Sequence, residues 1–310
     1  MGLTVAIVTY LRPDKLKRCL ASLISQARLP DRVIIVDNDI NRSAKPLCER
    51  YKKILHIKYL ATMTPNTPLA RNIALKNCQT ELLGFIDDDC VVESNWIQIA
   101  KNLKWRGAVA YILGDTKLYN PVNLITKCLH YRQKYWFNFD NLRNKPFTGP
   151  FSTDTKNILI NIVAVKRKKI WFDERLFLNP IGDHSDTDFG ILLKKRGFKG
   201  LYNSDLIVYH EESPIYANFL KKAYERGRVA FLISQKHGLH REFVFLPEAK
   251  LFRWLVRIKH WPDQINKWVG EIHEDWSSKF GIFLLMKLYD WYYLRGFTDE
   301  AKNRDVHLDL

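Results

Sequence analysis

The chain has 310 residues, of which 46% are hydrophobic, which is enough to bury the core of one large domain or of a domain with a substantial appendage. Its formal net charge of +16 is large for an enzyme, and it indicates an anionic partner such as a nucleic acid, an acidic lipid surface or a phosphorylated substrate, or else a basic surface without a partner. The irregular spacing of its cysteines excludes a small disulfide scaffold and predicts reduced, mostly buried thiols in a cytosolic protein. These five residues are Cys19, Cys48, Cys78, Cys90 and Cys128.

The first hundred residues alternate two hydrophobic periods in the order that is typical of a layered α/β domain. Leu3–Thr9 is an apolar, β-branched run that predicts a buried parallel strand, and apolar residues recur at helical spacing over Leu16–Ile24. The further predicted elements are strands at Arg32–Val36, Ile54–Leu60 and Glu81–Ile86, a short helix at Pro68–Lys76, and a helix that Ser94 caps and that runs through Ala100. This order predicts a Rossmann-like, mostly parallel central sheet flanked by helices.

Two of the predicted strands end in acidic residues. The second runs into Asp37, and the fourth runs into three consecutive aspartates, Asp87-Asp88-Asp89. Ligands of parallel α/β sheets bind beyond the carboxyl ends of the strands, so we expect the chemistry at these two points. Adjacent carboxylates raise one another's pKa unless a cation neutralises them, and Mg²⁺ or Mn²⁺ binds carboxylate oxygens while leaving positions open for phosphate. The three aspartates therefore predict a divalent metal site, with an acidic helix-capping turn as the alternative.

The middle of the chain, residues 111–183, is rich in aromatic and basic side chains and gives no clear prediction of secondary structure. Regular patterns return with a predicted helix at Ser185–Arg196, a strand at Gly200–Tyr209 and a helix at Tyr216–Ser234. The second half of the chain is therefore expected to contribute to the same α/β domain.

The end of the chain, from about Glu242, changes to helical patterns that carry five of the nine tryptophans. Three of these tryptophans follow one another at intervals of seven residues, among basic residues: Trp254, Trp261 and Trp268. This spacing is typical of a helix packed on its own domain or of one lying on a membrane surface. The most apolar stretch, Phe280–Leu294, is interrupted by Lys287 and Asp290, and it falls short of the roughly 20 apolar residues of a spanning helix. Because the first residues read as a strand and not as a secretion signal, we expect a cytoplasmic protein, peripheral at most on the cytoplasmic face of a membrane.

Several motifs in chain order resemble those of family 2 glycosyltransferases of the GT-A fold. The first strand, Val5–Tyr10, resembles the family's first strand, and Ala70-Arg71-Asn72 resembles its Ala-Arg-Asn signature at a helix start. Asp87-Asp88-Asp89 is similar to the Asp-x-Asp motif, in which Asp89 corresponds to the metal ligand, with its two neighbours facing ribose and metal-bound water. The resemblance implies that the donor nucleotide contacts Thr9, Tyr10, Arg12, Asp37, Asn38, Arg71, Asp87 and Asp88.

The resemblance continues as far as Gly227. Phe172–Phe177 resembles the segment that leads to the catalytic acid, and the stretch from Asp186 to Gly197 resembles the family's Glu-Asp-x-Asp helix. It implies that Asp186 is the general base, that Asp183 and Asp188 are the alternates, and that His210, at a strand end, is a second metal ligand. The sequence departs from the family at Ser185, where the family has a glutamate.

The fold class that follows is a GT-A α/β domain with a helical C-terminal extension. We predict the GT-A domain at residues 1–240, with a nucleotide-binding half at 1–115 and an acceptor and catalytic half at 116–240. A helical, basic, tryptophan-rich extension follows at 241–310.

The implied function is the inverting transfer of a sugar from a nucleotide diphosphate sugar, expected to be a UDP sugar, to a hydroxyl of a glycan or lipid-linked glycan acceptor. Such a reaction serves cell-surface polysaccharide synthesis and uses Mn²⁺ or Mg²⁺, and the basic C-terminal helices would lie on an anionic membrane. A nucleotidyltransferase is an alternative, but its glycine-rich phosphate loop is missing. A basic nucleic-acid-binding protein is another, but it leaves the strand-end aspartates unexplained, and no nucleic acid is expected as a partner. An inactive transferase of the same fold is a third.

Overall fold

The computed structural model describes residues 1–119, 121–137, 146–147, 153–239, 243 and 275–306. The chain divides into two compact units. The first consists of Met1–Tyr119, Phe137–Pro180 and Ser185–Glu211, and the second consists of Asn120–Trp136, Ile181–His184 and Glu212–Leu310. The predicted domain boundary at residue 240 lies outside the described residues, as do Trp254, Trp261 and Trp268.

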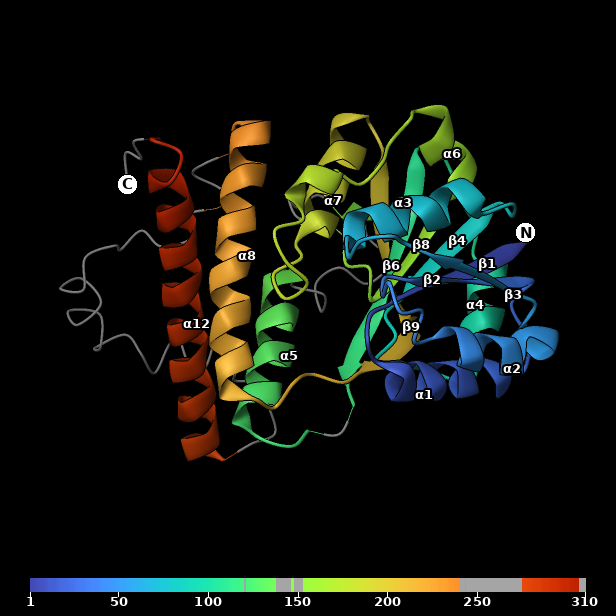
Figure 1. Ribbon diagram of the computed structural model, residues 1–310, viewed down its shortest axis with the longest axis horizontal. Coiled ribbons are helices and arrows are strands. Elements are labelled where there is room, and N and C mark those ends of the chain that lie inside the picture. Colours follow the sequence, from blue (N-terminus) through green and yellow to red (C-terminus); the bar gives the residue numbers. More distant parts are fainter. Residues whose placement is uncertain (120, 138–145, 148–152, 240–242, 244–274, 307–310) are drawn as a thin grey trace. The chain divides into compact units, whose positions relative to one another are not determined.

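The first unit is built on a sheet in which nine strands are described (Figure 1). Eight of them follow the order β3-β2-β1-β4-β8-β6-β9-β5, and β7 pairs with β9. The strands are β1 (Leu3–Thr9), β2 (Arg32–Asp37), β3 (Ile57–Ala61), β4 (Leu82–Ile86), β5 (Cys90–Val92), β6 (Val109–Leu118), β7 (Pro146–Phe147), β8 (Asn157–Asn161) and β9 (Lys199–His210).

The pairing is parallel through β3, β2, β1 and β4, as the sequence predicts, and also between β6 and β9. The other half of the sheet differs from a mostly parallel one, because β8 is antiparallel to both β4 and β6, and β5 and β7 are antiparallel to β9. These strands come largely from the stretch 111–183 that gave no prediction. The parallel half brings the carboxyl ends of β1, β2 and β4 to one edge, where the predicted acidic residues lie.

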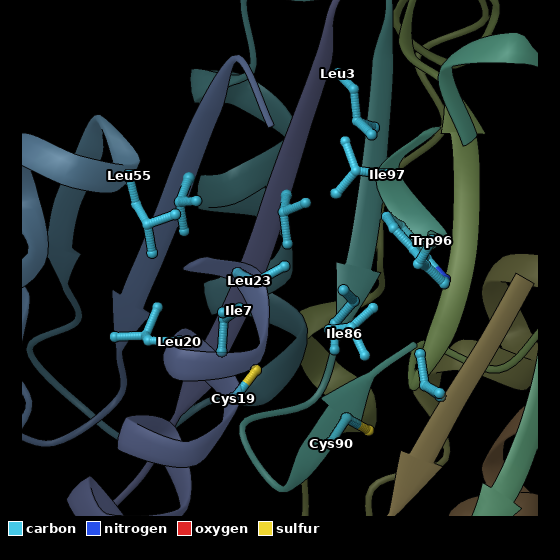
Figure 2. Close-up of a cluster of buried hydrophobic side chains, with 14 of the residues drawn as sticks. Leu3, Ile7, Cys19, Leu20, Leu23, Leu55, Ile86, Cys90, Trp96 and Ile97 are labelled. Carbon is cyan, nitrogen blue, oxygen red and sulfur yellow. The ribbon is translucent and has the colours of Figure 1, made fainter. Parts of the chain in front are cut away.

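Helices cover both faces of this sheet (Figure 1), and alternate residues of the strands pack against them. On β1, Leu3, Val5 and Ile7 belong to the core under α1 (Pro13–Ile24), α2 (Lys45–Leu55) and α4 (Trp96–Asn102). Ala6 belongs to the opposite core, under α3 (Thr67–Asn77), α6 (Ile162–Arg167) and α7 (Ser185–Lys195). Figure 2 shows the first core, to which Leu20 and Leu23 of α1 belong together with Ile7 of β1 and Ile86 of β4. This three-layer arrangement confirms the predicted α/β fold class.

Two local predictions were wrong. Residues Ile54 and Leu55, predicted to begin the third strand, end α2, because His56 takes a left-handed conformation (φ 48°) that stops the helix and lets β3 start at Ile57. Ser94 does not cap α4: its backbone N–H and its hydroxyl both donate to the carboxylate of Glu93, and the N-cap position is taken by Asn95.

The long strand β9 carries an irregularity that positions its carboxyl end. Gly114 of β6 pairs with Asn203, but the next residue of β6 pairs with Ile207, so residues 204–206 have no partner on β6. Asn203 Oδ1 accepts hydrogen bonds from the backbone N–H groups of Asp205 and Leu206, which closes this bulge. After the bulge β9 runs regularly to His210, beside β5.

The second unit contains three described helices, α5 (Leu124–Phe137), α8 (Tyr216–His237) and α12 (Trp276–Lys302), which lie side by side in Figure 1. Buried side chains of all three form one core, including Cys128, Phe219 and Tyr289. The helix predicted at Tyr216–Ser234 is confirmed. Among the described residues, no helix combines the length and the apolar character needed to span a membrane.

Candidate functional site

The three consecutive aspartates form the turn between β4 and β5, at the carboxyl edge of the parallel strands. Asp88 is completely buried and Asp89 is 8% exposed, whereas Asp87 is partly buried. The backbone N–H of Cys90 donates to the Asp87 carbonyl at 3.1 Å, which closes the turn. A tight turn thus holds three carboxylates at the edge of a sheet, largely away from water.

His210 reaches this turn from the other half of the sheet. In the antiparallel pair of β5 and β9, Cys90 faces His210, and the Glu211 backbone N–H donates to the Asp89 carbonyl at 3.1 Å. His210 Nε2 lies 3.2 Å from Asp89 Oδ1. Asp87, Asp89 and His210 each offer one possible ligand atom, and these three atoms all lie within 4.8 Å of one another. The two residues predicted as metal ligands are therefore together, and Asp87 joins them.

The charges of this turn are unevenly compensated. Burial, which Arg12 opposes only in part, raises the pKa of Asp88 to about 7. Burial and the charge of Asp89 also raise the pKa of Asp87. Burial acts in the same direction on Asp89, but His210, Arg12 and Lys15 outweigh it and hold the pKa of Asp89 well below its usual range. The neighbouring basic side chains therefore compensate the charge of Asp89 but not fully those of Asp87 and Asp88.

The donor set fits a divalent cation. Two carboxylates and an imidazole are ligands that Mn²⁺ and related ions accept, and the buried Asp89 Oδ1 faces the His210 ring without a hydrogen bond of regular geometry. Asp88 does not belong to this group of three, and its Oδ2 instead accepts a hydrogen bond from Thr9 Oγ1 at 2.7 Å. The arrangement favours Asp87, Asp89 and His210 as the metal-binding group.

Two basic side chains at the start of α1 contact the acidic turn. Arg12, at the start of α1, places its guanidinium 2.8 Å from Asp88 Oδ1 and 2.7 Å from Asp89 Oδ2. Lys15 Nζ lies 3.8 Å from Asp89 Oδ2 and 3.3 Å from Glu211 Oε1. Arg12 was among the predicted site residues, but Lys15 and Glu211 were not. Lys15 lies in the first turn of α1, three residues after the N-cap residue Arg12, and this proximity in sequence was the available signal.

The predicted nucleotide-contacting residues after β2 are buried and hold their own loop. Asp37 accepts hydrogen bonds from the backbone N–H groups of Asp39 at 3.1 Å and Ala44 at 2.9 Å, and from the Tyr59 hydroxyl at 2.9 Å. Its neighbour Asn38 donates its backbone N–H to the Thr9 carbonyl at 2.8 Å. Both residues thus lie beside the end of β1, and Asp37 serves first to shape the loop after β2.

Tyr10 follows Thr9 directly and is partly exposed. It therefore lies at the same sheet edge as the other predicted donor contacts, next to the strand end that holds Asp88.

Arg71 connects the acidic turn to the first turn of α7. Its guanidinium donates to Ser185 Oγ at 2.9 Å and lies 5.5 Å from the centre of the Phe172 ring. The Arg71 charge also counteracts the rise in the pKa of Asp87, so the two side chains are electrostatic neighbours. Ser185, which replaces the family's glutamate, is thus a hydroxyl partner of this arginine.

The three candidates for the general base differ in accessibility. Asp186, in the first turn of α7, is partly exposed, and its backbone carbonyl accepts a hydrogen bond from Thr153. Asp188, two residues further along α7, is fully buried, and Asp183 belongs to the second unit. Asp186 is next to the Arg71 partner Ser185.

The parallel strand order and the flanking helices make this first unit a GT-A glycosyltransferase fold. The chain belongs to glycosyl transferase family 2, whose family model matches residues 4–161. The predicted family is therefore confirmed, and the chain is classed as an enzyme. This assignment favours a glycosyltransferase over the nucleotidyltransferase and nucleic-acid-binding alternatives.

Two curated relatives are polysaccharide biosynthesis proteins. The succinoglycan biosynthesis protein ExoM of Rhizobium meliloti is 32% identical over 127 residues, which cover 39% of this chain and 41% of ExoM. The chondroitin synthase of Escherichia coli is 26% identical over 272 residues, which cover 76% of this chain and 38% of the synthase. The alignments thus span about two fifths of the length of each relative.

Two solved structures share the fold at low sequence identity. The mannosyltransferase PcManGT of Pyrobaculum calidifontis, in complex with GDP-Man and Mn²⁺, has a TM-score of 0.64 at 11% identity, covering 97% of this chain and 87% of PcManGT. The S. aureus TarS fragment 1–349, in complex with UDP, has a TM-score of 0.53 at 16% identity, covering 99% of this chain and 93% of the fragment.

Proposed function

We propose that this chain is an inverting, metal-dependent glycosyltransferase that moves a sugar from a UDP sugar to a hydroxyl of a glycan or lipid-linked glycan. The observation that carries the proposal is the grouping of Asp87, Asp89 and His210 at the edge where the parallel strands end. A nucleotide-binding half at 1–115 would supply the two aspartates, and an acceptor and catalytic half at 116–240 would supply the histidine. The polysaccharide biosynthesis relatives support a role in cell-surface polysaccharide synthesis.

The donor would be held chiefly through its charges. Asp89 and His210, with Asp87, would bind Mn²⁺ or Mg²⁺, which when bound neutralises negative charge on the departing diphosphate. Arg12 and Arg71 present guanidinium groups, which suit diphosphate oxygens because of their paired N–H donors. These side chains would hold the diphosphate as its bond to the anomeric carbon breaks during the attack of the acceptor.

The acceptor would be activated by Asp186. Its carboxylate takes the proton of the acceptor hydroxyl while the hydroxyl oxygen bonds to the anomeric carbon and the bond to the diphosphate breaks on the opposite face. This single displacement inverts the anomeric configuration without a covalent sugar-enzyme intermediate. Partial exposure supports Asp186 in this role over the fully buried Asp188, and Asp183 stays the other alternate.

The decisive experiment measures the release of UDP or GDP from a panel of nucleotide sugars, with and without Mn²⁺, in the presence of candidate glycan acceptors. We expect metal-dependent release for a UDP sugar and its loss in D89N and H210A, while the exposed-site control D14N keeps wild-type activity. Nuclear magnetic resonance of the product would establish whether the anomeric configuration is inverted. Absence of metal-dependent nucleotide binding, together with tight salt-sensitive RNA binding, would refute the proposal in favour of a nucleic-acid-binding protein.

An anionic membrane surface is the proposed location, on the cytoplasmic face. One face of α12 carries the exposed side chains of Trp276 (64%), Leu284 (38%) and Trp291 (51%), and its 3.6-residue period places Lys287 and Arg295 on the same face. Tryptophan beside basic residues suits the interface of a membrane that contains acidic lipids.

Flotation with vesicles tests this location. The wild-type protein should float with vesicles that contain acidic phospholipid and not with neutral ones, and the double variant W276S/W291S should float less. Equal flotation of the variant and the wild type would argue against docking through α12.

A further inference from the structure

The sheet edge opposite the acidic turn brings together four chain segments that are far apart in sequence. The first residue of β4, Leu82, pairs with the last residue of β8, Asn161, and the first residues of β6 and β9, Val109 and Lys199, pair with each other. The strands β4, β8, β6 and β9 are neighbours in the sheet. The segments that lead into or out of these strand ends therefore share one edge over three strand spacings, roughly 15 Å.

Exposed basic side chains follow one another along this edge. The four segments are residues 76–81, 101–108, 162–169 and 194–199, and their one acidic residue is Glu81, whose carboxylate accepts the Gly2 backbone N–H. We call their exposed basic residues the basic edge: Lys76, Lys104, Arg106, Arg167, Lys168, Lys169, Lys194, Lys195, Arg196 and Lys199. A large part of the net charge of +16 is thus gathered away from the candidate site.

The fold accounts for only some of these charges. Lys194 and Lys195 lie in the last turn of α7, where the helix dipole favours positive charge, and Lys76 Nζ lies 5.7 Å from the centre of the Trp171 ring. In the part of the chain that the structure describes, no ion pair joins Arg167, Lys168 or Lys199 to an acidic residue. Like charges gathered without counter-charges repel one another, so this edge attracts a multivalent anion.

The layout of the basic edge favours a broad anionic surface over a single phosphate or a nucleic acid. Its charges come from separate elements and are spread along the edge, so they do not converge on one point. Single-stranded nucleic acids stack their bases on exposed aromatic rings, but the aromatic residues of these segments, Trp105 and Phe198, are partly buried against the two cores of the sheet.

We propose that the basic edge docks on the surface of a membrane that contains acidic phospholipid, as a contact separate from the exposed face of α12. Basic residues near such a surface strengthen binding by a factor of about five each, without inserting apolar side chains. The inference deepens the proposed membrane location and does not depend on the transferase site.

Docking at this edge also orients the first unit. The acidic turn lies at the opposite end of the strands, roughly 20 Å away for a strand of seven residues such as β1. The candidate site would therefore face away from the lipid, which suits an acceptor hydroxyl at the far end of a glycan. This consequence, unlike the docking itself, rests on the proposed function.

Partition of the full chain into sedimenting vesicles tests the docking surface. The vesicles are phosphatidylcholine with and without phosphatidylglycerol, and the wild type is compared with K168E/K199E and with the matched control K17E/K45E. Each variant reverses two exposed lysines, so the change in net charge is the same. Lys17 lies on α1 and Lys45 begins α2, both outside the basic edge.

We expect the wild type and K17E/K45E to bind the acidic vesicles and not the neutral ones, and K168E/K199E to bind at least about 10-fold more weakly. Added salt should weaken the binding of the wild type. Equal weakening in both variants would show an effect of net charge alone, and unchanged binding of K168E/K199E would leave docking to α12. Either result overturns the proposal, as does RNA binding that is tighter than vesicle binding and is lost in K168E/K199E.

The proposed function fails by a different measurement. Calorimetry of UDP with Mn²⁺ should give the same dissociation constant for the wild type and both variants. If the wild type binds vesicles but no nucleotide, the transferase is refuted and the docking surface stands. Should K168E/K199E not fold, as judged by circular dichroism, the milder K168Q/K199Q and its control K17Q/K45Q decide the question.

Discussion

Gly227 of α8 is the position where a single methyl group should matter most for the second unit. A Cβ added there would lie 2.8 Å from the Tyr293 carbonyl carbon and 2.9 Å from the Phe297 nitrogen of α12, and nearer still to the Tyr293 oxygen, whereas ordinary contacts begin at 3.4 Å. All three are backbone atoms, which cannot rotate away. Gly296 of α12 approaches the backbone of Tyr224 in the same manner, so the two helices cross at paired glycines.

The substitution G227A therefore sets two effects against each other. Alanine in a helix interior gains about 1 kcal/mol over glycine, whereas overpacking a rigid contact costs about 3 kcal/mol or more. We expect the free energy of unfolding to fall by roughly 2 kcal/mol and the melting temperature by roughly 4–8 °C. Thermal and urea unfolding, followed by circular dichroism, measure this change.

Gly281 of the partner helix α12 supplies the matched control. A Cβ there would meet only the end of the Leu124 side chain, at 2.9 Å, which can move. G281A should therefore keep or raise the melting temperature. If G227A proves as stable as G281A, the close crossing of α8 and α12 is refuted.

Three further predictions concern the site and pH. H210A should weaken Mn²⁺ binding at least about 10-fold, measured by calorimetry, and an unchanged affinity would remove His210 from the metal group. D186N should lower kcat by about 10² to 10⁴-fold while leaving the dissociation constant of UDP unchanged, and equal losses in both would indicate a structural role instead. Burial, with the charges of Arg226 and Arg132, lowers the pKa of His184 to about 3, so the stability that the neutral ring confers is complete above pH 6.5 and is lost as the pH falls toward 3. H184Q should therefore remove up to about 1.4 kcal/mol per pH unit from the acid dependence of the unfolding free energy, and an unchanged dependence would contradict the lowered pKa of His184.

The parallel half of the fold was predictable because its signals are local. The strands that run into Asp37 and Asp87 are continuous apolar segments, and each is buried on both faces as parallel strands require. The start of β3 was missed because Ile54 and Leu55 are as apolar as a strand, and only the left-handed conformation of His56 separates the two elements.

The other half was not predictable because its strands depend on partners far along the chain. β8 is a five-residue strand between β4 and β6, and nothing in its own sequence specifies antiparallel pairing with either. The contacts of Lys15 and Glu211 with each other are likewise long-range and set by side-chain conformation. Motif resemblance located Asp89 and His210, but only the folded chain adds Asp87 to the same group.

The approach of His210 to Asp89 depends on the register of β9. Side chains of a strand alternate between faces, so a slip of one residue would turn the imidazole away from the acidic turn. The bulge at residues 204–206 sets this register, and Gly114 permits it, because an added Cβ there would meet both Asn157 and the Leu206 carbonyl. Asn157 in turn donates its side-chain amide to that carbonyl at 2.7 Å. The proposed metal-binding group thus depends on a glycine and an asparagine that are remote from it in sequence, and neither belongs to the acidic motif.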